Sequence, residues 1–358
     1  MGPGPSNPYP DVTMALAGPV VGHLDPQFLS LLDETNDRLR QVFCTANALT
    51  LPVSGTGSAG MEASFVNFVR PGDPVVVGVN GVFGERMCEV ACRHGAQVVR
   101  VEAAWGEPLD PEAILAAHPS PSIIAVVHAE TSTGVRNDIE PLGRGKGEAL
   151  LLVDVVTSLG GIPVDVDGWE VDIAYSGTQK CLGVPPGLAP LTVSPRALER
   201  IVERPSSWYL DLNLLARYVN DAAGTGRVYH HTAPVAMVDA LHAGLGTLLD
   251  EGLESAWQRH AACGQLLGDG LRGMGLELLV HDAGHRLPQL TTVKVPEGVD
   301  EGACRRQLLE TYGIEIGAGA GQLAGRVWRI GCMGHTARRR NVFALLEALR
   351  EVLHEVLG

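Results

Sequence analysis

The chain has 358 residues, 45% of them hydrophobic and 19% charged, and its formal net charge at pH 7 is −14. The acidic balance argues against a nucleic-acid-binding protein, and without a long apolar run or a basic-then-apolar N-terminus we expect no membrane span and no signal peptide. The seven cysteines stand at unrelated spacings, which argues against a metal site and favours a reduced, cytoplasmic protein.

The first half of the chain alternates predicted helices with short apolar strands. Residues 1–13 form a Pro/Gly-rich arm that we expect to be extended. We expect helices at about 25–43, 61–69, 83–94 and 111–117, and strands at 49–53, 75–79, 97–101, 123–127, 149–153 and 171–175. This alternation is typical of an α/β fold with a mostly parallel sheet that is covered on both faces.

The sequence of the second half of the chain predicts two long helices followed by a smaller domain. A helix from 195 to about 202 precedes a polar, loop-rich stretch at 204–232, and long helices follow at 233–249 and 253–274. Beyond them we expect strands near 276–280, 289–295 and 327–330 and helices near 301–312 and 336–357. The length suits one large and one smaller domain, so we place the arm at 1–13, the large domain at 14–254 and the small domain at 255–358.

Two chemical groups follow buried strands in the middle of the chain. Asp154 ends the apolar run 149–153, and open α/β sheets bind ligands at the carboxyl ends of their strands. Lys180 follows the strand 171–175 and precedes the rigid segment Gly183–Gly187. A lysine can form a Schiff base with an aldehyde cofactor, and an acid can keep a pyridine nitrogen protonated. The pair suggests pyridoxal phosphate, although the spacing alone fits a surface lysine and a helix-capping aspartate equally well.

Other polar segments also stand at the ends of predicted strands. Gly55-Thr-Gly-Ser58 precedes a helix, where free backbone N–H groups bind phosphate, but the lysine of a nucleotide-binding loop is missing. Phe83 begins a helix, and His128–Gly134 follows the strand 123–127. Arg329 lies on an apolar strand, where its planar fork could bind a carboxylate. Each feature alone also has a structural interpretation: a helix cap, a core aromatic residue, a structural histidine or an ion pair.

From Gly2-Pro-Gly-Pro-Ser-Asn7 to Arg329-Ile-Gly331 and the helix beyond it, the chain resembles the class V aminotransferases. The likeness is to the alanine–glyoxylate and serine–pyruvate branch of the fold-type I pyridoxal phosphate enzymes, and Tyr175–Leu182 resembles their cofactor-lysine region. The resemblance implies a large domain with a mostly parallel, seven-stranded sheet and a smaller C-terminal α/β domain. It also implies transamination between alanine or serine and glyoxylate or pyruvate.

The resemblance assigns roles to single residues of this chain. Lys180 would bond to the cofactor and move a proton, Asp154 would hold the protonated ring nitrogen, and Phe83 would stack on the ring. Arg329 would bind the α-carboxylate of the substrate. The remaining cofactor contacts would be Gly57, Ser58, Thr131, Gln179, Tyr229 and Thr232.

Two of these contacts imply a homodimer. In the family, the residues that match Tyr229 and Thr232 reach the phosphate in the neighbouring subunit. If this holds here, two active sites are shared at the subunit interface. The other partners would be small amino acids and 2-oxo acids, with neither nucleic acid nor membrane involved.

The chain departs from the family at residues 143–149. The family usually has a longer helix there, and three glycines in this span predict that no helix forms and that the cover of the sheet is thinner.

Two rival functions remain open. A lyase or desulfurase could use the same fold, but a desulfurase needs a cysteine in the loop Gly317–Gly325, which has none. A non-catalytic binding protein is the second rival. The combination of Asp154, Lys180 and Arg329 argues against it.

Overall fold

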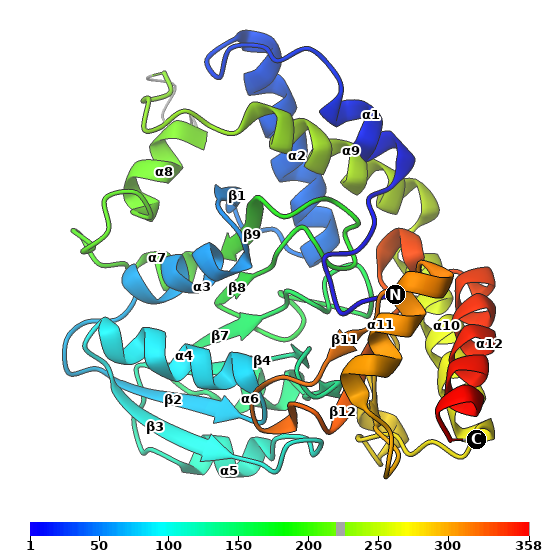
Figure 1. Ribbon diagram of the computed structural model, residues 1–358. Helices are drawn as coiled ribbons and strands as arrows, with labels where there is room; N and C mark the ends of the chain where they lie inside the picture. The colour runs from blue at the N-terminus through cyan, green and yellow to red at the C-terminus, as the bar shows by residue number, and fades with distance from the viewer. Residues whose placement is uncertain (220–225, 358) are drawn as a thin grey trace.

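The computed structural model describes residues 1–219 and 226–357. Its centre is a seven-stranded sheet in the order β1-β9-β8-β7-β4-β2-β3 (Figure 1). The strands are β1 Leu49–Ser54, β2 Pro74–Val79, β3 Gln97–Glu102, β4 Ile123–Val127, β7 Leu150–Asp154, β8 Ile173–Tyr175 and β9 Leu188–Val193. β9 runs antiparallel to β1 and β8, whereas the pairs from β8 to β3 are parallel. The predicted fold class is therefore confirmed.

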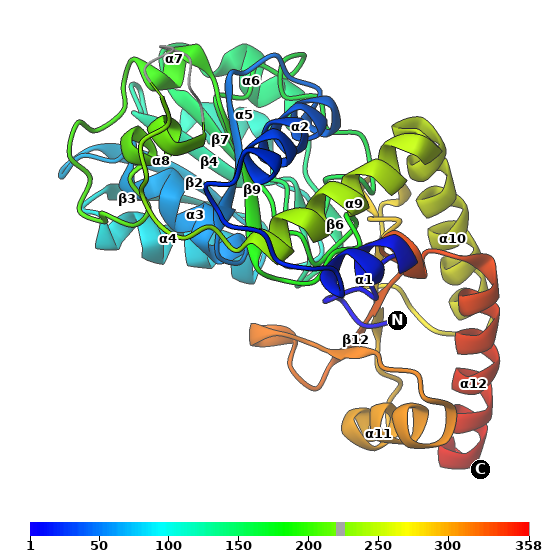
Figure 2. The same cartoon turned by 90° about the horizontal axis from the view of Figure 1, so that it is seen from above.

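Helices cover this sheet because its central strands are apolar on both faces. Every residue of β4 and β7 is buried, which parallel strands require when helices pack on each side. α3 and α4 lie on one face of the sheet and α5 and α6 on the other (Figure 2). The helices of this part are α1 Pro10–Leu16, α2 Pro26–Phe43, α3 Gly57–Val66, α4 Val82–Arg93, α5 Pro111–Ala116, α6 Glu140–Gly145, α7 Pro195–Leu198, α8 Leu212–Val219 and α9 Val235–Glu251.

A second hydrophobic core lies in the C-terminal part. It surrounds the fully buried Trp328, and Met1 packs against it from the chain start. A three-stranded antiparallel sheet, β10-β12-β11, contributes to it together with three helices. These elements are α10 Leu253–Gly273, β10 Leu290–Lys294, α11 Glu301–Tyr312, β11 Gly317–Ala318, β12 Val327–Gly331 and α12 Arg339–Leu357. We propose that the two domains meet near the expected boundary at 254/255, with Ala256 still part of the first core.

Several local predictions are wrong. β9 was not predicted, since Pro190 obscures it; this proline faces Pro52 of β1 inside the sheet. The expected strand at 276–280 is a single bridge between Leu278 and Val293. The helix after residue 195 is only α7, and residues 10–13 of the arm belong to α1.

Two further errors concern helices that the composition concealed. α8 lies inside the stretch expected to be loop-rich, and it forms because Leu212, Leu215 and Tyr218 recur at helical spacing and are buried. Residues 220–225 of that stretch lie outside the described residues. α6 continues through two glycines of the span 143–149, because packing favours them: a Cβ at Gly143 would lie 1.8 Å from the Trp169 carbonyl oxygen. In the part of the chain that is described, no helix combines the length and the apolar character needed to cross a membrane.

Candidate active site

A buried carboxylate ends the strand β7. Asp154 is 2% exposed; its Oδ1 accepts a hydrogen bond from the Val156 N–H at 2.8 Å, and its Oδ2 accepts one from the Tyr175 hydroxyl at 2.7 Å. Tyr175 ends β8 and pairs with Asp154 in the parallel register, which brings the two side chains together. Burial raises the pKa of Asp154 to about 7, and the two hydrogen bonds oppose this shift. We had not predicted the contribution of Tyr175, although its place at the strand end would have indicated it.

Lys180 lies in the same buried region. It is 9% exposed, and its Nζ donates a hydrogen bond to the carbonyl oxygen of Pro3 in the N-terminal arm. The Ser6 hydroxyl donates to the carbonyl of Lys180 at 2.7 Å, and the Ser6 N–H donates to the carbonyl of Gln179 at 2.8 Å. Burial lowers the pKa of Lys180 to about 8, and the Arg329 guanidinium acts in the same direction. The arm therefore covers the lysine, a contact that the sequence did not predict.

The start of α3 lies beside this pair. α3 begins at Gly57, and the side chain of its N-cap, Thr56, makes no capping hydrogen bond to the first turn. A Cβ at Gly57 would lie 3.1 Å from Val156 Cγ2 and 3.6 Å from the Gly177 Cα, so the helix start touches the segments that follow β7 and β8. Backbone N–H groups at such a helix start bind anions.

The segment before Lys180 contains both structural and unpaired groups. The Ser176 hydroxyl donates to the Val155 carbonyl and the Thr178 hydroxyl to the Pro185 carbonyl, so both hold the local backbone. Gln179 Oε1, in contrast, is buried without a hydrogen-bond partner. A buried, unpaired acceptor of this kind suits contact with a bound ligand.

Phe83 and Arg86 lie together near the start of α4. The Arg86 guanidinium lies 4.9 Å from the centroid of the Phe83 ring, and it donates to Ser58 Oγ at 3.3 Å. Arg86 thus joins the α3 start to the aromatic residue. Apart from its helical spacing from Phe83, nothing in the sequence indicated a role for this arginine.

Arg329 approaches the site from β12. Its Nε donates to the Ala318 carbonyl at 2.7 Å and its Nη1 donates to the Thr131 carbonyl at 3.2 Å. Thr131 is itself buried, with its hydroxyl 3.3 Å from that of Thr157. Within the described ranges, no carboxylate forms an ion pair with Arg329, so the structural ion pair considered above is not observed.

Tyr229 and Thr232 lie at the surface, as does Ser58 among the other predicted site residues. Both side chains are exposed, and their hydroxyl oxygens are 3.4 Å apart. Thr232 lines a surface hollow together with Gly55 and Ser58. They do not contact Lys180 of the same chain by any hydrogen bond among the described residues.

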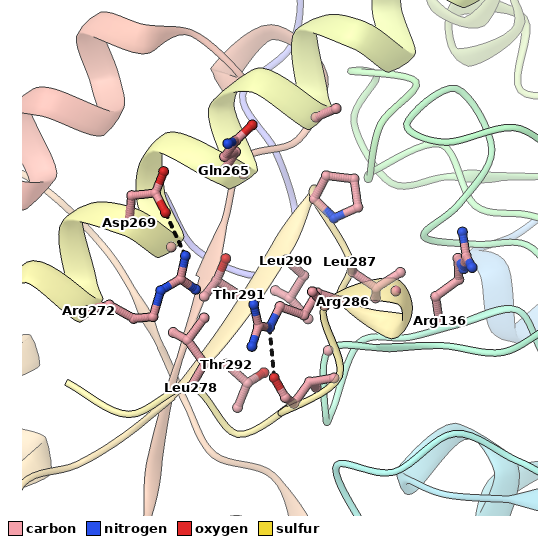
Figure 3. Close-up of a pocket in the computed structure, with 18 residues that line it drawn as sticks. Arg136, Gln265, Asp269, Arg272, Leu278, Arg286, Leu287, Leu290, Thr291 and Thr292 are labelled. Carbon is pink, nitrogen blue, oxygen red and sulfur yellow. Dashed lines mark hydrogen bonds and ion pairs between the residues drawn. The ribbon is translucent and has the colours of Figure 1, made fainter.

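A separate pocket lies between α10 and the segment 278–292 (Figure 3). Its three arginines already have partners: Arg136 pairs with Asp138, Arg272 pairs with Asp269, and Arg286 donates to the carbonyls of Val280 and His281. None of the predicted site residues lines it. The described residues also contain no group of three or more His, Cys, Asp or Glu side chains placed to hold a metal ion.

Known proteins resemble this chain in sequence and in fold. The model of the family described as Aminotransferase class-V matches residues 13–335, and the chain belongs to this family. It is similar to the crystal structure of alanine–glyoxylate aminotransferase from Nostoc sp., with 48% identity, 99% of this chain and 94% of that one covered, and a TM-score of 0.95.

Two further relatives extend the comparison. The structure of ureidoglycine–glyoxylate aminotransferase from Bacillus subtilis is 39% identical, with 100% of this chain and 93% of that one covered and a TM-score of 0.96. Alanine–glyoxylate aminotransferase from Callithrix jacchus is 41% identical, with 99% of this chain and 87% of the relative covered. The protein is thus an aminotransferase whose cofactor is pyridoxal phosphate, and its substrates are small amino acids and keto acids.

The residues present fit this cofactor. Its ring nitrogen suits the buried carboxylate of Asp154, and its phosphate suits the uncapped start of α3. Its aldehyde suits the buried amine of Lys180.

Proposed function

We propose that this enzyme transfers an amino group between alanine or serine and a small 2-oxo acid, glyoxylate or pyruvate. The observation that carries the proposal is the convergence of Lys180 and the buried Asp154 with Arg329, whose guanidinium has no carboxylate partner in the described chain. The names of the similar proteins, alanine–glyoxylate and ureidoglycine–glyoxylate aminotransferase, support a small amino donor and glyoxylate.

Lys180 is proposed to hold the cofactor and to move the proton. Its Nζ would hold the cofactor through the aldehyde carbon, and the amine, when free, would take the proton from the substrate Cα. A pKa of about 8 leaves part of the amine neutral near neutral pH, which a base requires. Burial next to Arg329 therefore prepares the amine for its task.

Asp154 is proposed to hold the proton on the ring nitrogen. Pyridoxal phosphate, when bound, supplies a ring that accepts the electrons of the bond broken at Cα. The Tyr175 hydroxyl and the Val156 N–H fix the Asp154 carboxylate through 2.7 and 2.8 Å hydrogen bonds. These two hydrogen bonds hold the Asp154 carboxylate in one orientation.

Other residues are proposed to bind and orient the reactants. Gly57 and Ser58 at the start of α3, together with Gln179, bind the phosphate. Phe83 packs on the ring, and Thr131 lies on the side of the ring hydroxyl. Arg329 binds the α-carboxylate through its two-pronged guanidinium and so orients the donor for proton removal.

The protein is proposed to act as a homodimer with shared sites. Tyr229 is 54% exposed and Trp208 is 62% exposed, and Tyr209, next to Trp208 in the sequence, is also exposed. Exposed aromatic residues of this size mark interaction surfaces. In the dimer, Tyr229 and Thr232 reach the phosphate site of the partner subunit. A cytoplasmic location remains a proposal that rests on the cysteine spacings.

The experiment is a half-reaction panel followed by product analysis. Purified enzyme is mixed with single amino acids, and the change in the cofactor absorbance spectrum is recorded for each. Alanine and serine should react fastest, and glyoxylate should restore the starting spectrum with formation of glycine. Release of ammonia and pyruvate from serine without an acceptor would contradict the proposal in favour of a lyase.

The desulfurase alternative gains no support from the cysteines. Cys332, which follows Arg329 on the chain, is fully buried, and burial raises its pKa to about 12. A nucleophilic thiol needs the opposite shift.

A further inference from the structure

A buried carboxylate outside the roles above lies next to the candidate active site. Glu130, on the short strand β5 Ala129–Glu130, is 0% exposed. Fully buried glutamates are rare unless they are paired, yet no lysine or arginine in the described residues forms an ion pair with it. Its charge must therefore be satisfied by another kind of partner.

The partners of Glu130 are four hydrogen-bond donors. Oε1 accepts from the Ser132 N–H at 3.0 Å and from the Ser132 hydroxyl at 2.6 Å. Oε2 accepts from the N–H groups of Phe83 at 3.1 Å and Gly84 at 3.4 Å, in the first turn of α4. These donors fill the acceptor sites of the carboxylate, and the positive end of the helix dipole stabilises its charge.

Ser132 and Gly81 complete the contact between Glu130 and the start of α4. Ser132 Oγ accepts a hydrogen bond from the Val82 N–H at 2.9 Å, so three successive N–H groups of α4 are held by Glu130 and Ser132. A Cβ at Gly81 would lie 2.4 Å from Glu130 Cδ, and only glycine leaves room for this approach. The start of α4 is thereby fixed to the segment that contains Thr131.

We propose that Glu130 is a positioning residue that holds Phe83 over the cofactor ring, at a fixed place relative to Thr131. The inference rests on the proposed function only for the contact between Phe83 and the ring. Glu130 acts through the backbone of Phe83, and it neither touches the substrate nor moves a proton.

The test is a double-mutant cycle between Glu130→Gln and Phe83→Leu. Glutamine keeps the shape but replaces one acceptor oxygen by an NH₂ group that faces two donors. Glu130→Gln should weaken cofactor binding about tenfold or more in titrations of the protein with pyridoxal phosphate, and should change the visible circular dichroism of the bound cofactor. In the Phe83→Leu background, Glu130→Gln should weaken cofactor binding by less than about twofold, because the side chain through which Glu130 acts has been removed.

Glu85→Gln is the matched control. Glu85 lies in the same first turn of α4 but is exposed, so its variant should bind the cofactor like the wild type. If Glu130→Gln does not fold, Ser132→Ala enters the same cycle, since it removes only one hydroxyl of the contact. Unchanged cofactor affinity and dichroism in Glu130→Gln overturn the inference, as does an equal loss with and without Phe83. A wild-type protein that does not bind pyridoxal phosphate would instead contradict the proposed function.

Discussion

Asp154 and Lys180 share a buried region, and burial shifts both toward their neutral forms. The pKa of Asp154 is raised to about 7 and that of Lys180 is lowered to about 8. Arg329 lies close enough to lower the pKa of Lys180, yet an arginine stays charged at any physiological pH. The site therefore combines an amine that can move a proton with a fixed cation that suits a carboxylate.

The role of Arg329 predicts a loss of donor affinity when its geometry is changed. Arg329→Lys keeps the charge but loses the two-pronged donor, so the KM for alanine or serine should rise roughly ten- to a hundredfold while the cofactor stays bound. Steady-state kinetics measure the KM, and the absorbance spectrum shows whether the cofactor stays bound. Amines without a carboxylate serve as the control, and their KM should change little between the wild type and Arg329→Lys. Equal losses for amines and amino acids, with a lower Tm, would contradict a carboxylate-binding role.

The raised pKa of Asp154 predicts a pH-dependent stability in the cofactor-free protein. The folded pKa of about 7 lies above the ordinary 3.8, so the folded state binds this proton more tightly. The contribution to the free energy of unfolding is full below about pH 4 and is lost as the pH rises to about 7, with a total on the order of 4 kcal/mol. Urea unfolding from pH 4 to 8 should therefore show a flatter profile for Asp154→Asn than for the wild type.

Two further variants serve as tests of the pH-dependent unfolding measurement. Tyr175→Phe removes a hydrogen bond that lowers the pKa of Asp154, so the loss of stability should extend to higher pH. The exposed Glu85→Gln should follow the wild-type profile. Parallel profiles for wild type and Asp154→Asn would show that Asp154 does not titrate in this range.

At the scale of elements, the strand that ends in Asp154 and the strand that precedes Lys180 were predictable because they are short, apolar and followed by polar residues. β9 and α8 were missed for opposite reasons: Pro190 hides a buried strand, and polar neighbours hide a helix with a buried face. Glu130 was unpredictable because two of its four donors come from α4, far away in the sequence. The same holds for the arm, whose contact with Lys180 joins residues that are 177 positions apart.

The contact between the N-terminal arm and Lys180 predicts that one methyl group added at Gly4 lowers the activity. Gly4 has φ +105°, and a Cβ there would lie 2.7 Å from Lys180 Nζ. Gly4→Ala should therefore displace the arm or the lysine and lower kcat/KM on the order of tenfold to a hundredfold. Gly72→Ala is the control: its φ is +89° but nothing lies within 4 Å of its Cβ, so it suffers the strain without the contact. Equal activities in the two variants would contradict a functional contact of the arm.

At the scale of the whole molecule, the residues that the chain leaves exposed are as informative as those it buries. Tyr229 and Thr232 face solvent, whereas the other predicted contacts of the cofactor gather near Lys180 or at the start of α3. The proposed active site assembled from two subunits would account for this division, and the sequence could suggest it only through the family resemblance.

A shared site predicts complementation between two inactive variants. Lys180→Ala and the double variant Tyr229→Ala, Thr232→Ala are mixed, unfolded and refolded together. In a mixed dimer, one site then has an intact set of residues and the other lacks both contributions, so part of the activity should return. The separately refolded variants are the controls. Subunit exchange without any recovery would count against a site shared between subunits.

The most direct measurement concerns the covalent bond between the protein and its cofactor. The holoenzyme is reduced with borohydride, digested and mapped by mass spectrometry. The pyridoxyl group should be found on the peptide that contains Lys180, and Lys180→Ala should carry no label after the same treatment. A pyridoxyl group on another lysine, or a label that persists in Lys180→Ala, would contradict the assignment of this site.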